Sequence, residues 1–329
     1  MFVATGVGSL PGADADAYAD AVRLVLDQVP DLPYLPELPR RGAEASMTGR
    51  ALALLVGLGA DLQPAGWRLH DSVGADLRRA RSTLSRDLDL VEELTQGYTG
   101  PFKVQVTGPW TLAATVERPR GDLVLGDHGA RRDLAQSLAE GVAEHVRDLR
   151  RRLPGATLLV QLDEPALPGV LAGRVPTASG LRRHRTVEPP GASEALGWVL
   201  AAVADAGADS VVHCCAPAPP TALLLGAGAD AVSVDLALLG PADLDALAQA
   251  WDDGHGVHLG VVPAHEPGTD PDDRQLTERV LRTLDMLGLG PADVAERMVI
   301  TPSCGLADAG ERWARRAHQL ARTVARNLG

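Results

Sequence analysis

Aromatic side chains are scarce in this sequence: they make up 3% of its 329 residues, whereas hydrophobic residues make up 45%. The core must therefore be built from aliphatic side chains. No uninterrupted apolar run reaches the roughly 18 residues of a membrane-spanning helix, and the N-terminus lacks the basic and apolar regions of a secretory signal. We therefore expect a soluble, cytoplasmic protein with no membrane partner.

Clusters of positive charge are also few. The net charge is −12, and the short runs Arg150–Arg152 and Arg182–Arg183 are typical of solvated helix ends or loops. A protein that follows the phosphates of a nucleic acid needs an extended basic surface. The sequence therefore argues against nucleic acid as a partner.

Only three cysteines are present, an odd number that in a cytoplasmic protein favours metal binding or catalysis over disulfides. His213 and Cys215, in Ser210-Val-Val-His-Cys-Cys-Ala216, lie two residues apart near the end of an apolar run, so their side chains point the same way on a strand. Cys304 follows another apolar run and is the natural third ligand for a zinc ion. The alternative is that these cysteines are small buried hydrophobes.

The sequence does contain a regular alternation of short apolar runs and longer amphipathic segments, which is typical of βαβ units. The runs are Phe2–Val7, Tyr34–Pro36, Lys103–Val106, Thr157–Leu162, Ser210–Cys214, Ala231–Val234, Gly256–Val261 and Met298–Ile300. The amphipathic segments are residues 15–28, 43–58, 73–95, 131–152, 192–206, 241–251, 272–287 and 310–328. Eight strands with helical crossovers predict an α/β fold of the (β/α)8 TIM-barrel type, as one domain over residues 1–329. An open doubly wound sheet is the alternative.

Three segments interrupt the alternation. Residues 61–72 contain proline and tryptophan and are expected to form an extra loop or hairpin over the mouth of the barrel. Residues 110–129 and 168–190 are rich in glycine, proline and arginine. Loops of this length in a compact domain are usually functional lids or disordered segments.

Polar or metal-binding residues follow each predicted strand, at the end of the barrel where catalytic residues lie in this fold. They are the glycine-rich turn with Gly8 and Ser9, Glu37, the Thr107-Gly-Pro turn, Asp163 and Glu164, His213 and Cys215, Asp235, His265, and Cys304. Buried carboxylates are costly unless they are paired or employed, so Asp163 or Glu164 is expected to face the barrel mouth. One of the two acids capping a helix is the alternative, and His265 alone also fits an ordinary loop histidine.

Taken together, these motifs resemble the C-terminal catalytic barrel of cobalamin-independent methionine synthase. The wider group includes uroporphyrinogen decarboxylase and zinc-dependent thiol methyltransferases. The resemblance runs from Gly6-Val-Gly-Ser-Leu-Pro11 to Pro302-Ser-Cys-Gly-Leu306 and so covers nearly the whole chain. The N-terminal half of the full-length enzyme has no counterpart in these residues.

The resemblance implies a zinc cofactor. His213, Cys215 and Cys304 match the family's zinc ligands, and Asp235 stands where the family has a glutamate ligand. Period-two geometry and the family spacing favour Cys215 over Cys214 as the ligand, with Cys214 pointing into the barrel wall.

The resemblance also implies a pocket for an amino acid. Gly8 and Ser9 match the turn that holds the substrate carboxylate, Glu37 and Asp163 match the acids that hold its ammonium group, and His265 matches a histidine proposed as proton donor. Asp163 and His265 are therefore the expected catalytic residues.

The implied activity is methyl transfer to the thiol of homocysteine, in methionine biosynthesis. The chain reads Ala307-Asp-Ala where the family tends to carry basic residues, and Thr115 stands near a tryptophan position of the folate-using enzymes. We therefore expect a donor other than methyltetrahydrofolate, with a methyl-donor protein such as a methylcorrinoid protein as a possible partner. The alternatives are a zinc- or amino-acid-binding protein without methyl transfer, another thiol alkyltransferase, or a decarboxylase of the same superfamily.

Overall fold

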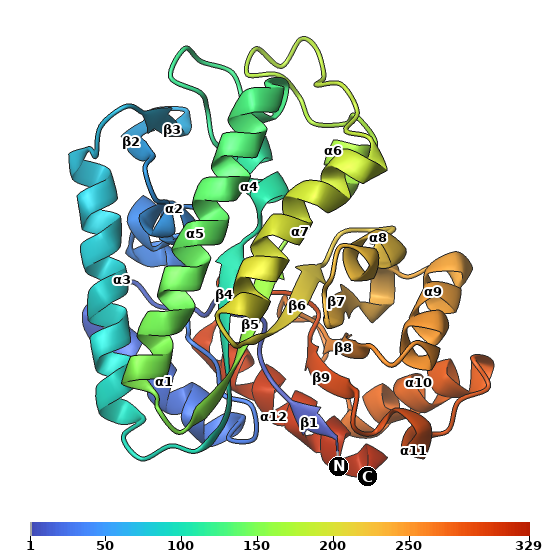
Figure 1. The fold of residues 1–329 in the computed structure, drawn as a ribbon. Helices are drawn as coiled ribbons and strands as arrows, with labels where there is room; N and C mark the ends of the chain where they lie inside the picture. The colour runs from blue at the N-terminus through green and yellow to red at the C-terminus, as the bar shows by residue number, and fades with distance from the viewer. Residues whose placement is uncertain (1) are drawn as a thin grey trace.

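The fold, seen in a computed structural model that describes residues 2–329, is a curled parallel β-sheet with helices on its outer face (Figure 1). The strands of this sheet are β1 (Val3–Ala4), β4 (Gly100–Thr107), β5 (Ala156–Asp163), β6 (Asp209–Cys214), β7 (Ala231–Asp235), β8 (Gly256–Val262) and β9 (Met298–Pro302). They lie in the order β1-β9-β8-β7-β6-β5-β4, and each pair of neighbours is parallel. The sheet therefore gathers the carboxyl ends of its strands at one edge.

Helices follow nearly every strand, as the alternation of the sequence predicts. They are α1 (Ala15–Gln28), α2 (Met47–Leu54), α3 (Ala75–Leu94), α4 (Pro109–Thr115), α5 (His128–Arg152), α6 (Leu167–Leu171), α7 (Pro189–Asp205), α8 (Thr221–Gly226), α9 (Pro241–Asp252), α10 (Asp273–Met286), α11 (Pro291–Val294) and α12 (Glu311–Leu328). Short 3-10 helices lie at Pro39–Arg41, Ala43–Ala45, Val124–Gly126 and Leu236–Leu238. None of the helices in residues 2–329 has the length and apolar character to cross a membrane.

The closed ring of eight regular strands that the sequence predicts is not what the structure has. Within residues 2–329 the sheet has seven strands. Residues 33–37 lie in space between the edge strands β4 and β1, but they make only isolated bridges to their neighbours. The Leu35 N–H donates to Lys103 O at 2.9 Å, and the Glu37 N–H donates to Gly8 O at 3.1 Å. Two of the five residues of this segment are proline, which has no N–H to donate, so a continuous ladder cannot form here.

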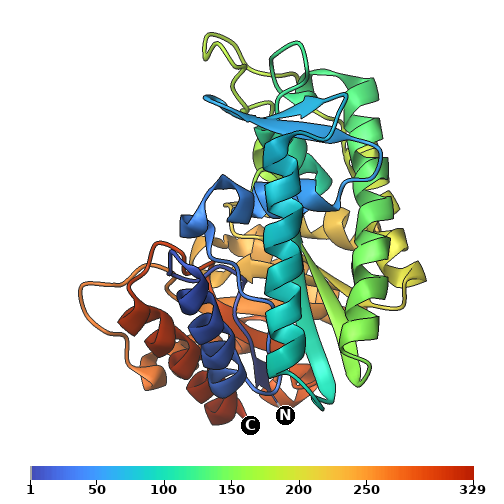
Figure 2. The same ribbon diagram turned by 90° about the vertical axis from the view of Figure 1, so that its left-hand side faces the viewer.

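The excursion expected at residues 61–72 is a hairpin of two antiparallel strands. These are β2 (Gly59–Gln63) and β3 (Gly66–His70), and Figure 2 shows them lying across the end of α3. Arg68 of β3 forms an ion pair with Glu117, at 2.5 Å between Nη2 and Oε2. The hairpin is thereby fastened to the loop that follows α4.

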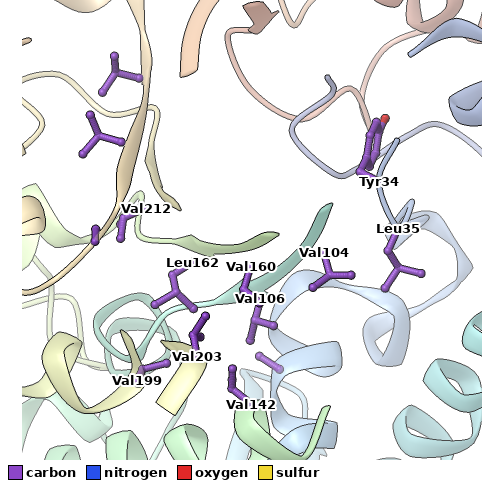
Figure 3. Close-up of a cluster of buried hydrophobic side chains, with 14 of the residues drawn as sticks. Tyr34, Leu35, Val104, Val106, Val142, Val160, Leu162, Val199, Val203 and Val212 are labelled. Carbon is purple, nitrogen blue, oxygen red and sulfur yellow. The ribbon is translucent and has the colours of Figure 1, made fainter. Parts of the chain in front are cut away.

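Alternating side chains divide β4, β5 and β6 into an apolar face and a polar face. Figure 3 shows the apolar face, where valine and leucine side chains of these strands lie against side chains of α5 and α7: Val104, Val106, Val160, Leu162, Val212, Val142, Val199 and Val203. The residues between them along the strands are polar and buried: Lys103, Gln105, Gln161, Asp163 and His213. Because side chains alternate along a strand, these polar groups face the concave side of the sheet.

One buried histidine ties α12 to the segment between β4 and β1. His318 is fully buried, its Nε2 lies 2.9 Å from the Tyr34 hydroxyl, and the two rings stack with centroids 5.9 Å apart. Burial lowers the pKa of His318 to about 4, from 6.5. The folded protein therefore favours the neutral imidazole more strongly than the unfolded chain does.

We expect a His318→Gln variant to lose less stability on acidification than the wild-type protein. The folded-state pKa is the lower one, so the stabilisation is fully present above pH 6.5 and is lost as the pH falls towards 4. At about 1.4 kcal/mol per pKa unit, the difference between the two proteins should grow by about 3 kcal/mol across that window. Urea unfolding from pH 8 to pH 4 measures it, and parallel pH profiles would refute it.

Candidate metal centre and adjoining acidic residues

Three potential metal ligands converge at the carboxyl edge of the sheet. His213 lies in β6, Cys215 follows it, and Cys304 follows β9. One ligand atom from each lies within 4.8 Å of the other two, and the two sulfur atoms are 3.0 Å apart. The turns after β6 and β9 thus bring into contact two cysteines that are 89 positions apart in the sequence.

The imidazole of His213 has one nitrogen held and one nitrogen free. Its Nδ1 lies 2.9 Å from the Ser233 hydroxyl, whereas its buried Nε2 has no hydrogen-bond partner among residues 2–329. A buried nitrogen without a partner costs free energy, and a metal-binding histidine commonly has its second nitrogen held in this way. The residues present therefore fit a metal ion at Nε2.

The two sulfur atoms share a hydrogen bond that polarises them in opposite directions. This bond and the nearby His213 lower the pKa of Cys304, whereas the same bond and burial raise the pKa of Cys215. Thiolate is the form of cysteine that binds metal, so the pair already favours one ligand in its binding form. Cys214 is fully buried and lies outside this group.

Asp235, expected as a fourth ligand, is not brought into the group. It ends β7, and its Oδ1 accepts a hydrogen bond from the Ala237 N–H at 2.8 Å, which caps the following 3-10 helix. Aspartate favours such caps because its short side chain reaches the backbone two residues on. Asp235 is one methylene shorter than the glutamate expected at this position, and here its carboxylate serves the local turn.

The turn with Gly8 and Ser9 lies directly against the turn that carries Cys304. The Leu306 N–H donates to Ser9 O at 2.8 Å, and a Cβ placed on Gly305 would lie 2.1 Å from Ser9 Oγ. A side chain at residue 305 would therefore have to displace the Ser9 hydroxyl. The expected carboxylate-binding turn and the metal group are therefore immediate neighbours.

Glu37 is buried next to this turn and belongs to an ionic network. Its Oε1 lies 3.3 Å from Nε of Arg50, whose Nη1 lies 2.6 Å from Asp87. Arg41 binds both oxygens of Asp87, at 2.8 and 2.7 Å. Burial raises the pKa of Glu37, and Arg50 opposes this. Arg50 therefore favours the carboxylate form of Glu37.

The adjacent acids at the end of β5 have different partners. Glu164 accepts hydrogen bonds from the N–H groups of Trp110 and Thr111 and from the Thr111 hydroxyl, at 2.7 to 2.8 Å, and so binds the N-terminal turn of α4. Asp163 accepts one from Gln161 Nε2 at 2.7 Å and pairs with His213 in the strand register. Glu164 thus fits the capping alternative, and Asp163 lies beside the metal group.

His265 lies away from these buried groups. It occupies a bend after β8 and is exposed, in contrast to the buried His213. The bend is nevertheless at the carboxyl end of β8, the same edge of the sheet as the metal group. The geometry makes His265 accessible from solvent without bringing it to the cysteines.

Sequence reasoning missed several buried polar residues of this region. Arg50 supports Glu37, and Gln161 links Asp163 to the fully buried Lys103. Arg50 lies in a segment that reads as an ordinary amphipathic helix, so no pattern distinguished it. For Lys103 a signal did exist, because it is the sole lysine of the sequence.

Comparison with known proteins assigns this arrangement to a family. The family model described as "Cobalamin-independent synthase, Catalytic domain" matches residues 87–327. A B12-independent methionine synthase from Shewanella sp. W3-18-1, in complex with selenomethionine, is similar in structure at a TM-score of 0.66. Its sequence is 13% identical, and the match covers 100% of this chain and 98% of that one. At this identity the likeness is evidence for the fold alone.

Other solved structures are more distant. A D-allulose 3-epimerase from Methylomonas sp. is 14% identical, with 84% of this chain and 93% of that chain covered, at a TM-score of 0.40. A likeness at that level has no bearing on function. No curated protein matches the sequence.

Proposed function

Because the chain belongs to the cobalamin-independent synthase catalytic-domain family, we propose that it transfers a methyl group to the thiol of homocysteine, giving methionine. One observation supports the proposal: three potential metal ligands and two buried carboxylates lie next to one another. Asp163 and His213 are register partners on neighbouring strands, and the turn of Ser9 contacts the turn of Cys304. An amino acid with a side-chain thiol matches both parts of this arrangement: its thiol suits the potential metal ligands, and its ammonium group suits the carboxylates.

Each protein group has a role in this proposal. Glu37 and Asp163 bind the ammonium group of the substrate, and the backbone of Gly8 and Ser9 binds its carboxylate. Two buried carboxylates are costly without cationic partners, so an incoming ammonium group is stabilised between them. The amino acid is thereby held in one orientation, with its side chain directed to one place. Fixing this geometry before the reaction lowers the entropic part of the activation barrier.

The metal we propose is zinc, held by His213, Cys215 and Cys304. The orphaned Nε2 of His213 and the paired sulfur atoms support this assignment. Such an ion would supply a Lewis acid that lowers the pKa of the substrate thiol. Ser233 holds the His213 ring in the orientation that leaves Nε2 available.

His265 is proposed to transfer a proton at the methyl donor. It is exposed at the carboxyl edge of the sheet, where a donor approaching from solvent reaches it. An imidazole can both donate and accept a proton and so suits general acid catalysis. The donor itself is proposed to be a carrier other than methyltetrahydrofolate, on the sequence differences noted above.

The test compares two thiols on the zinc-loaded protein by calorimetry. Homocysteine should bind at least about tenfold more tightly than 4-mercaptobutanoate, which lacks only the amino group and so places no ammonium group between Glu37 and Asp163. Methionine formation is then assayed with a panel of methyl donors. Equal binding of the two thiols would refute the amino-acid pocket. Tight homocysteine binding without methyl transfer from any donor would favour a binding protein instead.

A further inference from the structure

Lys103 is an exception in both composition and position. The sequence has 31 basic residues, of which 30 are arginine and one, Lys103, is lysine. That lysine is also fully buried, on the polar face of β4. Buried lysines are rare unless paired, and the proposed mechanism gives this one no role.

The ammonium group of Lys103 has no carboxylate in contact within residues 2–329. Its Nζ donates to Val7 O and to Gln161 Oε1, both at 2.8 Å, and lies 5.1 Å from the centre of the Tyr34 ring. Gln161 in turn donates through Nε2 to Asp163 Oδ1 at 2.7 Å. The Gln161 amide therefore links the ammonium group of Lys103 to the carboxylate of Asp163.

The charges around Lys103 set how readily it loses its proton. Burial lowers its pKa, while Asp163 on β5 and Glu37 on the segment before α2 raise it. Two further neighbours of Lys103 are neutral at pH 7, because burial lowers the pKa of His258 on β8 to about 3 and raises that of Tyr34. Lysine changes protonation readily when buried, whereas arginine keeps its charge. A lysine is thus the one basic side chain able to act as a removable charge here.

The charge balance of the pocket changes when an amino acid binds. Without ligand, Glu37 has Arg50 as its partner, and hydrogen bonds through Gln161 link Asp163 to Lys103. An ammonium group placed between Glu37 and Asp163 adds one positive charge to a buried site. Arg50 cannot release a proton, so the surplus charge falls on Lys103.

We propose that Lys103 is a positioning residue that acts through Gln161 as a stand-in cation for Asp163, and that it releases its proton when the substrate ammonium group binds. The N–H bond of Nζ breaks, the electron pair stays on nitrogen, and the proton goes to solvent. The number of ammonium groups that serve Asp163 is then the same before and after binding. This inference rests on the proposed function, because it requires an ammonium group between Glu37 and Asp163.

The single lysine makes the test direct. Zinc-loaded protein with ¹³C-labelled lysine gives one side-chain signal, whose chemical shift follows the protonation of Lys103 from about pH 6 to about pH 9. Saturating methionine should lower the pKa of Lys103 by on the order of 1 to 2 units, as expected for a second cation within several ångströms at an effective dielectric constant near 20. The analogue 4-(methylsulfanyl)butanoate, which lacks the amino group and carries only a negative charge, should not lower the pKa of Lys103.

Two variants separate charge from structure. Lys103→Arg has a permanent charge and should bind methionine at least about tenfold more weakly than Lys103→Met, which has none. Both should bind the analogue without an amino group equally. A merely structural lysine would not make methionine affinity depend on the charge at this position.

The outcomes distinguish the two proposals. If calorimetry shows that methionine binds but the pKa of Lys103 does not move, the lysine inference is wrong and the proposed function stands. If methionine and homocysteine both fail to bind the folded, zinc-loaded protein, the amino-acid pocket is refuted and the lysine inference with it.

Discussion

A Cys304→Ser variant is expected to lose the proposed zinc ion and with it nearly all of the proposed methyl transfer. Cys304 supplies one of three ligand atoms within 4.8 Å of one another, and its sulfur is the one whose pKa is lowered. Loss of a residue that merely supports a ligand costs about 10- to 100-fold in metal affinity, so loss of a ligand should cost at least about 100-fold. Elemental analysis after dialysis against a weak chelator, together with homocysteine binding, measures the effect.

The matched control is Cys214→Ser in the same part of the chain. Cys214 is buried next to Cys215 but lies outside the ligand group, so this variant should lose some stability and keep its zinc. A Cys304→Ser protein with a full complement of zinc and unchanged homocysteine binding would show that the cysteines are structural. Equal zinc loss in both variants would point to disruption of the fold instead.

An Asp87→Ala variant is expected to unfold more easily by about 3 to 5 kcal/mol. Asp87 is 2% exposed and accepts hydrogen bonds from the guanidinium groups of Arg41 and Arg50. Its removal leaves two positive charges in a partly buried site, and breaking a buried pair from one side has this order of cost. Urea unfolding should show a lower midpoint with an unchanged slope.

The control for this variant lies two residues further along α3. Asp89 forms an ion pair with Arg152 at 2.8 Å, but its side chain is 61% exposed. Exposed pairs contribute about 0 to 1 kcal/mol, so Asp89→Ala should be almost neutral. Equal effects of the two substitutions would show that burial of the Asp87 network does not matter. Asp87→Ala should also weaken homocysteine binding, because Arg50 is the partner of Glu37.

Much of the fold was predictable because strands and helices differ in hydrophobic period. The runs at Thr157–Leu162 and Ser210–Cys214 coincide with β5 and β6 to within a residue or two. The prediction of a regular strand at Tyr34–Pro36 was wrong, because the apolar character of this run resembles a strand while the prolines of residues 33–37 prevent a ladder. The hydrophobic period indicates which side chains are buried, but it does not show whether each residue has a backbone N–H group to donate.

The candidate site was predictable to the extent that it lies at strand ends. His213, Cys215 and Cys304 each follow an apolar run, and parallel strands bring their carboxyl ends together. Asp235 follows a run in the same way, yet its carboxylate is used by the nearest backbone N–H group. Whether the carboxylate binds a metal or the backbone depends on about one turn of the chain around it. The positions of the strand ends in the sequence do not reveal which of the two occurs.

The position of Lys103 also has a consequence for proteolysis. A lysine-specific endopeptidase has one cleavage site in these 329 residues, after a side chain that is fully buried in the middle of β4. Cleavage requires β4 to leave the sheet, so fraying of helices or loops elsewhere would not lead to cleavage. The yield of the fragments 1–103 and 104–329 would then report the population in which the sheet itself has opened.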